Sequence, residues 1–178
     1  MEKGTRWIYA GTVAWQDEKN QVHRRQLQWQ SEVLDSATRG QYRIALLHGY
    51  PSDLTWYGEQ TKRGYYILVA HGNRKLYLSD RVTPETKLPL SYSALRHVCY
   101  NGNLIFKLPL RDGEIFGFGA DRGQRDGTFY VWMVDSIRPP EYVLIYRTLP
   151  DHQIVTYIPG IGSTHKCTAT TGLFPKSM

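Results

Sequence analysis

Apolar and polar side chains alternate along most of this chain, which is the pattern of antiparallel strands that turn one face to water. The clearest example is residues 141–162, where two alternating segments flank the turn Leu149–His152 and a Pro-Gly-Ile-Gly sequence closes the second segment. Proline suits the first central position of a tight turn, and glycine accepts backbone angles that other residues avoid. We therefore predict a β-hairpin here.

A second, longer hairpin is predicted near the N-terminus from Thr5–Trp15 and Val22–Leu34. The stretch Asp35–Gly40 that follows is small and polar, and we predict a loop there. In the second strand of this hairpin, glutamine, arginine and glutamate face water, and they alternate with a less polar series made of Leu27, Trp29, Ser31 and Val33.

Further segments have the length and apolar content of strands, and one stretch, Ser91–Val98, suits one or two helical turns. Asp135 interrupts the apolar alternation of its segment and either ends a strand or lines a cavity. Many strands with short connections predict an all-β fold, an antiparallel meander that forms a strongly curved sheet or a barrel, with at most one short helix near residues 91–98. The further predicted strands are Gln41–His48, Leu54–Tyr57, Gly64–Ala70, Lys75–Leu78, Leu104–Leu110, Glu114–Ala120, Thr128–Ile137 and Ser163–Thr171.

The length of 178 residues predicts a single β domain over residues 1–178. Within it, two similar halves are a further hypothesis, at about residues 4–80 and 104–172. Gly4-x-x-Trp7-x-Tyr9 parallels Gly113-x-x-Phe116-x-Phe118, and each motif precedes a charged turn and a long aromatic strand. The alternative is that aromatic hairpins with proline turns resemble each other by chance.

The net charge of +6 is spread along the chain, and no run of five or more basic residues occurs. A scattered surplus is typical of a soluble surface, so we expect no nucleic-acid partner. No segment approaches the roughly 18–20 apolar residues that a membrane-spanning helix needs. The N-terminal residues Met1–Gly4 lack the apolar core of a signal peptide, which fits a cytoplasmic protein and equally one whose signal has been removed.

The residues that often carry chemistry form no recognisable motif. The six histidines show no metal-binding or protease spacing, and His165 with Cys167 lacks a third ligand, so we expect no metal and no cofactor. Cys99 and Cys167 are either two separate thiols or one disulfide. A small hydrolase-like enzyme would need at least two side chains from one set to converge, namely His71, His97, His152, Asp135 and Cys167.

Aromatic side chains are the strongest candidates for a binding site. A closed or half-closed antiparallel barrel with aromatic inward faces can hold one apolar ligand. The alternative is that the same side chains only fill the core, as aromatic residues do in most small β domains. The candidate cavity-lining residues are Trp7, Tyr9, Trp29, Phe116, Phe118, Tyr130 and Trp132.

Several motifs resemble a loosely defined group of uncharacterised bacterial β-rich proteins, many of them exported or lipid-anchored. The motifs are Gly4-x-x-Trp7-x-Tyr9, Phe106-x-Leu108-Pro109-Leu110, Tyr130-x-Trp132-x-Val134, Tyr146-Arg147-Thr148-x-Pro150-Asp151 and Pro159-Gly160-Ile161-Gly162. The group ends in an aromatic strand, often with a His-His-Gly-Thr sequence, where this chain has Lys166–Thr171. The resemblance implies residence in the cell envelope and carries no activity.

Three functions follow as hypotheses. The first is a non-enzymatic β protein of the bacterial envelope that binds an apolar small molecule or a protein partner on a curved sheet. The second is a cytoplasmic interaction module that pairs its exposed strand edges with a partner. The third is the small hydrolase-like enzyme.

Overall fold

A computed structural model describes residues 1–16, 19, 21–50, 63–72, 74–80, 82–117, 131–147, 151–158 and 162–170. The predicted strand Leu54–Tyr57, the candidate residues Phe118 and Tyr130, and the turn residues 148–150 and 159–161 lie outside the described part.

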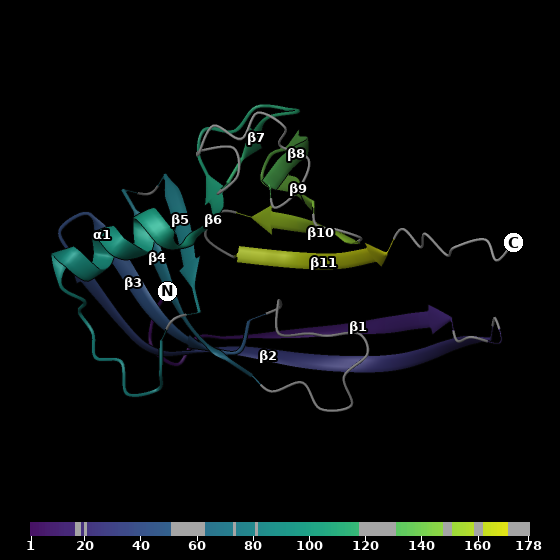
Figure 1. The fold of residues 1–178 in the computed structure, drawn as a ribbon, viewed down its shortest axis with the longest axis horizontal. Helices are drawn as coiled ribbons and strands as arrows, with labels where there is room; N and C mark the ends of the chain where they lie inside the picture. Colours follow the sequence, from purple (N-terminus) through teal and green to yellow (C-terminus); the bar gives the residue numbers. More distant parts are fainter. Residues whose placement is uncertain are drawn as a thin grey trace, which may run out of the picture. The chain divides into compact units, whose positions relative to one another are not determined.

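The described chain forms two sheets in which neighbouring strands follow one another along the sequence (Figure 1). The order is β1-β2-β3-β4-β5-β6 in the first sheet, which is strongly curled into an antiparallel half-barrel, and β11-β10-β9-β8-β7 in the second. The predicted all-β meander is therefore confirmed. The strands are β1 (Arg6–Gln16), β2 (Val22–Arg39), β3 (Tyr42–His48), β4 (Tyr65–His71), β5 (Lys75–Ser79), β6 (Asn103–Lys107), β7 (Ile115–Phe116), β8 (Val131–Arg138), β9 (Glu141–Arg147), β10 (Asp151–Ile158) and β11 (Gly162–Thr170).

The chain divides into two compact units, each of which we describe by itself. The first unit contains Met1–Gly72 and Tyr77–Gly102, and the second contains Asn73–Leu76 and Asn103–Met178. The single domain over residues 1–178 stays a prediction.

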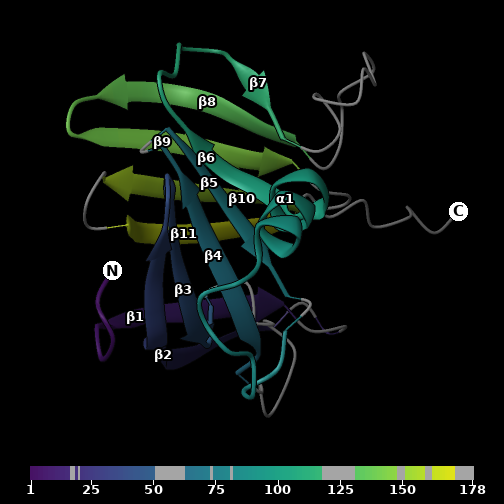
Figure 2. The same cartoon turned by 90° about the vertical axis from the view of Figure 1, so that its left-hand side faces the viewer.

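The predicted helix is present as α1 (Tyr92–Asn101), which reaches three residues beyond Val98. It begins at Ser91 because the Ser91 hydroxyl accepts a hydrogen bond from the backbone N–H of Ala94 at 3.1 Å. The helix lies against β4 in the first unit and buries Leu95 and Val98 (Figure 2). No helix among the described residues is long and apolar enough to cross a membrane.

The predicted loop Asp35–Gly40 is wrong, because β2 continues to Arg39. The register with β3 shifts between Val33 and Asp35, so that Leu34 is an extra residue in a bulge and the pairing then resumes. Arg39 is held in place by a hydrogen bond from its side chain to the Leu90 carbonyl at 2.9 Å and by the Tyr92 ring at 4.6 Å. The polar composition of this stretch predicted a loop, but pairing with β3 keeps the backbone extended as a strand.

Each unit contains the same backbone arrangement, which we call the corner: a turn with a glycine is hydrogen-bonded to a valine that precedes a bulge. In the first unit, the Gly4 N–H donates to the Val33 carbonyl at 2.8 Å, and the Val33 N–H donates to the Thr5 carbonyl at 2.9 Å. In the second, Gly113 donates to Val134 at 3.0 Å, and Val134 donates to Glu114 at 2.9 Å. Each glycine lies within a turn of the same kind and has a positive φ, 84° at Gly4 and 72° at Gly113. In both units a bulge follows the valine.

The second unit packs its core on one face of its sheet. Phe116, Val134 and Leu144 are each 1% exposed. Phe106 of β6 stacks on the Tyr157 ring at 4.3 Å and meets the Tyr142 ring edge-on at 5.6 Å. These contacts account for the apolar positions on that face of β7 to β10.

Asp135 neither ends its strand nor lines a cavity. It is the extra residue of the bulge between Val134 and Ser136, its side chain is exposed, and β8 continues to Arg138. The chain then turns at Pro139-Pro140 and returns as β9, which pairs with β10 as the predicted hairpin.

Candidate functional site

The β1–β2 hairpin of the first unit brings three of the predicted aromatic residues to one face. In the register of the two strands, Trp7 lies opposite Ser31 and Tyr9 lies opposite Trp29. Partners across an antiparallel pair project to the same side, as do residues two apart along a strand. Trp7, Tyr9, Trp29 and Ser31 therefore share one side of the hairpin, which we call the aromatic face.

Two polar groups on the aromatic face are buried without a partner. Trp29 is 9% exposed and Ser31 is 2% exposed. Within the part of the chain that the structure describes, neither the Trp29 Nε1 nor the Ser31 Oγ has a hydrogen-bond partner. Leaving such a group buried and unsatisfied costs about 1–3 kcal/mol, so a pair of them in one place calls for an explanation.

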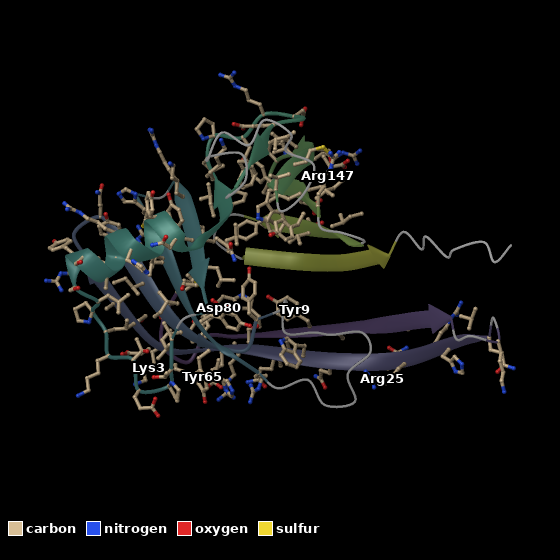
Figure 3. The ribbon with its side chains drawn as sticks, in the orientation of Figure 1. Lys3, Tyr9, Arg25, Tyr65, Asp80 and Arg147 are labelled. Atoms are coloured by element: carbon tan, nitrogen blue, oxygen red, sulfur yellow. The ribbon has the colours of Figure 1, made fainter. Side chains whose placement is uncertain are left out.

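The third polar group on this face is the Tyr9 hydroxyl. Burial raises the pKa of Tyr9 to about 12, because the desolvated surroundings penalise the phenolate form. Tyr9 is thus neutral at every physiological pH. Figure 3 labels Tyr9 on β1.

The opposite side of the same hairpin is a water-facing surface. Ile8 is 63% exposed, and the Arg6 guanidinium pairs with the Glu32 carboxylate at 2.9 Å. Thr12 donates from its hydroxyl to the Gln26 side-chain oxygen at 3.1 Å. The hairpin is therefore amphipathic, as its alternating sequence predicts, with polar pairs satisfied on one side and aromatic rings on the other.

The other described candidates, Phe116 and Trp132, belong to the second unit. They pair across β7 and β8, and Phe116 is fully buried in the core of that unit. The Trp132 ring lies 4.7 Å from the Tyr146 ring. Phe116 therefore packs in the core of the second unit, while Trp132 is half-buried.

A shallow pocket of about 330 Å³ opens elsewhere in the first unit. Its lining includes polar side chains and none of the predicted aromatic residues. An apolar ligand would gain little there compared with the aromatic face, so we base the candidate site on the latter. The pocket residues are Met1, Ser36, Ala37, Thr38, Arg43 and Ile44.

Of the five residues proposed for hydrolysis, the side chains of three are described, and they stand on three different elements: His71 on β4, His97 on α1 and Asp135 on β8. His71 stacks on the Tyr42 ring at 4.7 Å, and the His97 ring nitrogen lies 3.1 Å from the Asn101 amide on α1. Among the described residues, no three His, Cys, Asp or Glu side chains come together as a metal site would require. Cys99 on α1 is half-buried, while the side chains of His152, His165 and Cys167 lie outside the described part.

Ser31 is the residue of the candidate site that sequence reasoning missed. It stands in an otherwise apolar alternation between Trp29 and Val33, which is a visible signal. A single hydroxyl on an apolar strand face must find a partner or stay unsatisfied. Only the register with β1 shows that it lies beside Trp7 and Tyr9.

Comparison of the chain with protein-family models, with curated proteins and with solved structures finds no match. The resemblance to exported bacterial β-rich proteins accordingly stays a prediction, and the aromatic face of the first unit carries the functional argument.

Proposed function

We propose that this protein binds an apolar small molecule, without chemical conversion, on the aromatic face of its first unit. The observation that carries the proposal is the pair of buried groups, the Trp29 indole N–H and the Ser31 hydroxyl, which lack a protein partner in the described chain. A bound molecule that shields the rings and accepts a hydrogen bond would remove the cost of both groups.

The aromatic face also favours binding in two ways, through its contact area and through the fixed positions of its residues. Large aromatic rings give extensive contact area with little loss of side-chain freedom. Trp7, Tyr9 and Trp29 stand on the paired strands β1 and β2, so the backbone ladder fixes their spacing before a ligand arrives. A site that is ordered in advance loses less entropy on binding.

The test is a fluorescence titration with the neutral apolar probe N-phenyl-1-naphthylamine. We expect saturable binding by the full chain and a loss of about tenfold in affinity for both Tyr9→Ala and Trp29→Ala, since each removes a ring from the face. Ile8→Ala is the matched control, because Ile8 lies next to Tyr9 in β1 but points to the water-facing side. Its affinity should equal that of the wild type.

Two outcomes would overturn the proposal. One is that the wild type binds no probe. The other is that Tyr9→Ala and Trp29→Ala bind as tightly as Ile8→Ala, with circular dichroism showing that all variants are folded.

Edge-strand pairing with a protein partner is the second candidate. β1 ends the first sheet, is 11 residues long and exposes Ile8, whereas natural edge strands are usually short. Ile8→Lys should block such pairing and leave probe binding intact, which separates the two functions. Size-exclusion chromatography with light scattering on both proteins checks whether the edge pairs with a second copy.

We place this binding role in the bacterial cell envelope on the strength of the sequence resemblance alone. Fractionation of the source cells with an antibody against the protein tests the location. Recovery in the cytoplasm would contradict the envelope and leave the binding proposal standing.

A further inference from the structure

We propose that the first unit binds a small oxyanion, a carboxylate or a phosphate group, in the pocket of about 330 Å³ that is lined by β2, β3 and Met1. This site is separate from the aromatic face, and the inference goes beyond the proposed function and does not depend on it. It follows from the polar groups that line the pocket and from the lack of a carboxylate among its described lining residues.

The strand register places one cation and two hydroxyl groups on the same side of the β2–β3 pair. Arg43 of β3 lies opposite Thr38 of β2. Ser36 is two positions before Thr38, so its side chain projects to the same side. Directly opposite residues have Cβ atoms about 5 Å apart, and diagonal neighbours lie about 7 Å apart. One small ligand can therefore contact all three side chains, and all three line the pocket.

These groups are suited to an oxyanion. A guanidinium donates hydrogen bonds from a planar fork that matches the paired oxygens of a carboxylate or a phosphate. The hydroxyl groups of Ser36 and Thr38 can each donate one more hydrogen bond. The pocket volume lies at the lower end of the range for small-molecule sites, so the ligand that it accommodates is small.

The Arg43 guanidinium is available for such a ligand. Among the described residues, Arg43 makes no hydrogen bond, ion pair or ring contact. Its partner on β4 is Ala70, which carries no charge. The nearest acidic residue along β2, Asp35, lies opposite Leu46 on the other side of the sheet, and its carboxylate accepts a hydrogen bond from the Ser36 backbone N–H at 2.9 Å. The described lining of the pocket therefore has a positive charge without a counter-charge of its own.

Two buried residues separate this pocket from the aromatic face. Val33 and Leu47 lie opposite each other between Ser31 and Ser36 on this side of the sheet, and they are 0% and 2% exposed. A ligand in the pocket and a ligand on the aromatic face therefore contact different residues.

The test is a ¹H–¹⁵N NMR titration of the full chain with sodium butyrate, sodium phosphate and the neutral analogue butyramide. The ionic strength is held constant, because salt screens exposed charges. We expect at least one of the two anions to shift the Arg43 Nε–H and the backbone amides of Ser36 and Thr38, with a dissociation constant of about 1 mM. Butyramide should shift none of them. The anion that binds more tightly identifies the ligand as a carboxylate or a phosphate.

Variants of Arg43 separate a built site from general attraction. Arg43→Gln should weaken anion binding at least about tenfold, because it removes the charge-assisted hydrogen bonds. Arg43→Lys keeps the charge but lacks the fork, so its affinity should fall between those of the wild type and Arg43→Gln. The matched control is Arg96→Gln, which removes the same charge from an exposed position on α1 outside the pocket lining. Its affinity should equal that of the wild type.

Three results would overturn the inference. The first is that neither anion shifts the resonances of Ser36, Thr38 and Arg43. The second is that butyramide binds as tightly as the anions. The third is that Arg96→Gln weakens binding as much as Arg43→Gln, since the positive net charge would then account for it. Should a variant not fold, the wild-type comparison of the anions with butyramide decides the matter. Binding of N-phenyl-1-naphthylamine is measured separately, so this inference and the proposed function can fail independently.

Discussion

The first and second units build the same backbone corner and use it in different ways. Trp7 and Ser31 in the first unit occupy the positions that Phe116 and Trp132 occupy in the second, counted from the shared hydrogen bonds at Val33 and Val134. In the second unit Phe116 is 1% exposed and belongs to the core, while Trp132 is half-buried. In the first, these positions leave a buried hydroxyl without a partner in the described chain. Phe116 packs into the core of its unit, whereas Ser31 belongs to the face where we propose that a ligand binds.

The outward-facing rows differ as well. In the first unit the row is Arg6, Glu32, His48 and Tyr65, with an ion pair at 2.9 Å and a ring stack at 4.8 Å. The equivalent row of the second unit is Ile115, Met133, Ile145 and Ile154. The comparison teaches that the turn, the glycine and the bulge determine the backbone, while the side chains on either face are free to vary.

Arg147 flanks the apolar row of the second unit. Its guanidinium donates to the Met133 sulfur at 3.3 Å; Arg147 is labelled in Figure 3. A thioether is a weak acceptor, so this contact stabilises the unit less than the Arg6–Glu32 pair stabilises the first.

The largest expected effect on stability is at Phe116, and it contrasts with the effect at Trp7, the equivalent inward-facing position of the first unit. Phe116→Ala should lower the free energy of unfolding by about 3–5 kcal/mol, because it leaves a cavity in a closed core. Trp7→Ala should cost less than half as much, since Trp7 is only half-buried. Urea unfolding followed by circular dichroism measures both. Equal losses would contradict the claim that the two corners have different roles.

The next largest loss of stability is expected from substitutions of the two glycines. Gly4→Ala and Gly113→Ala should each cost about 1–2 kcal/mol, because a residue with a Cβ is strained at positive φ. A Cβ at either position meets nothing within 4 Å, so the cost comes from the backbone alone and should be alike at both. Thermal unfolding of the two variants provides the comparison. A loss confined to one glycine would show that the corners are not equivalent.

Glu114 of the second unit occupies the position that Thr5 occupies in the first, so Glu114→Thr makes the two units alike at this position. It removes the ion pair from the Lys107 ammonium to the Glu114 carboxylate at 2.6 Å and should cost about 0.5–1 kcal/mol at neutral pH. The Lys107 hydrogen bond is the main cause of the lowered pKa of Glu114, and the folded form therefore favours the carboxylate.

The sign of the pH dependence follows from that lowered pKa. The stabilisation is complete above the ordinary pKa of 4.5 and is lost as the pH falls through the lower, folded-state pKa. Urea unfolding of the wild type and Glu114→Thr between acidic and neutral pH should show the two curves converging in acid. A difference that grows in acid would have the wrong sign.

The smallest effect on stability is expected from exchanging the outward rows. The double variant Ile115→Arg, Met133→Glu transplants the Arg6–Glu32 pair and should change the free energy of unfolding by less than about 1 kcal/mol, as exposed ion pairs do. It should also reduce binding of the apolar dye 8-anilinonaphthalene-1-sulfonate. Unchanged dye binding would mean that the dye does not report on this row.

Alternation predicted much of the fold because antiparallel strands with one solvated face leave that pattern in the sequence. The N-terminal hairpin, the final hairpin and the helix near Ser91 lie where the sequence predicts them. The extension of β2 to Arg39 was missed, since small polar residues such as Ser36 and Thr38 favour turns locally and only pairing with β3 keeps them extended.

The site was predictable in part. Trp7 and Tyr9 share one face of β1, and Trp29 and Ser31 share one face of β2, because the spacing is even along each strand, and the sequence shows both pairs. The register that sets Ser31 beside Trp7 is a long-range property with no local signal. For the same reason the sequence alone does not distinguish Phe116 and Trp132 from Trp7 and Tyr9, although Phe116 is part of a core.

The central claim is that an apolar small molecule binds on the aromatic face beside Trp29 and Ser31. The direct measurement is a ¹H–¹⁵N correlation spectrum of the tryptophan indole N–H groups during titration with N-phenyl-1-naphthylamine, with Trp29 assigned by Trp29→Phe. We expect the Trp29 resonance to shift on binding, and to shift most among the five indole signals. A Trp29 resonance that stays in place at saturating ligand would contradict it.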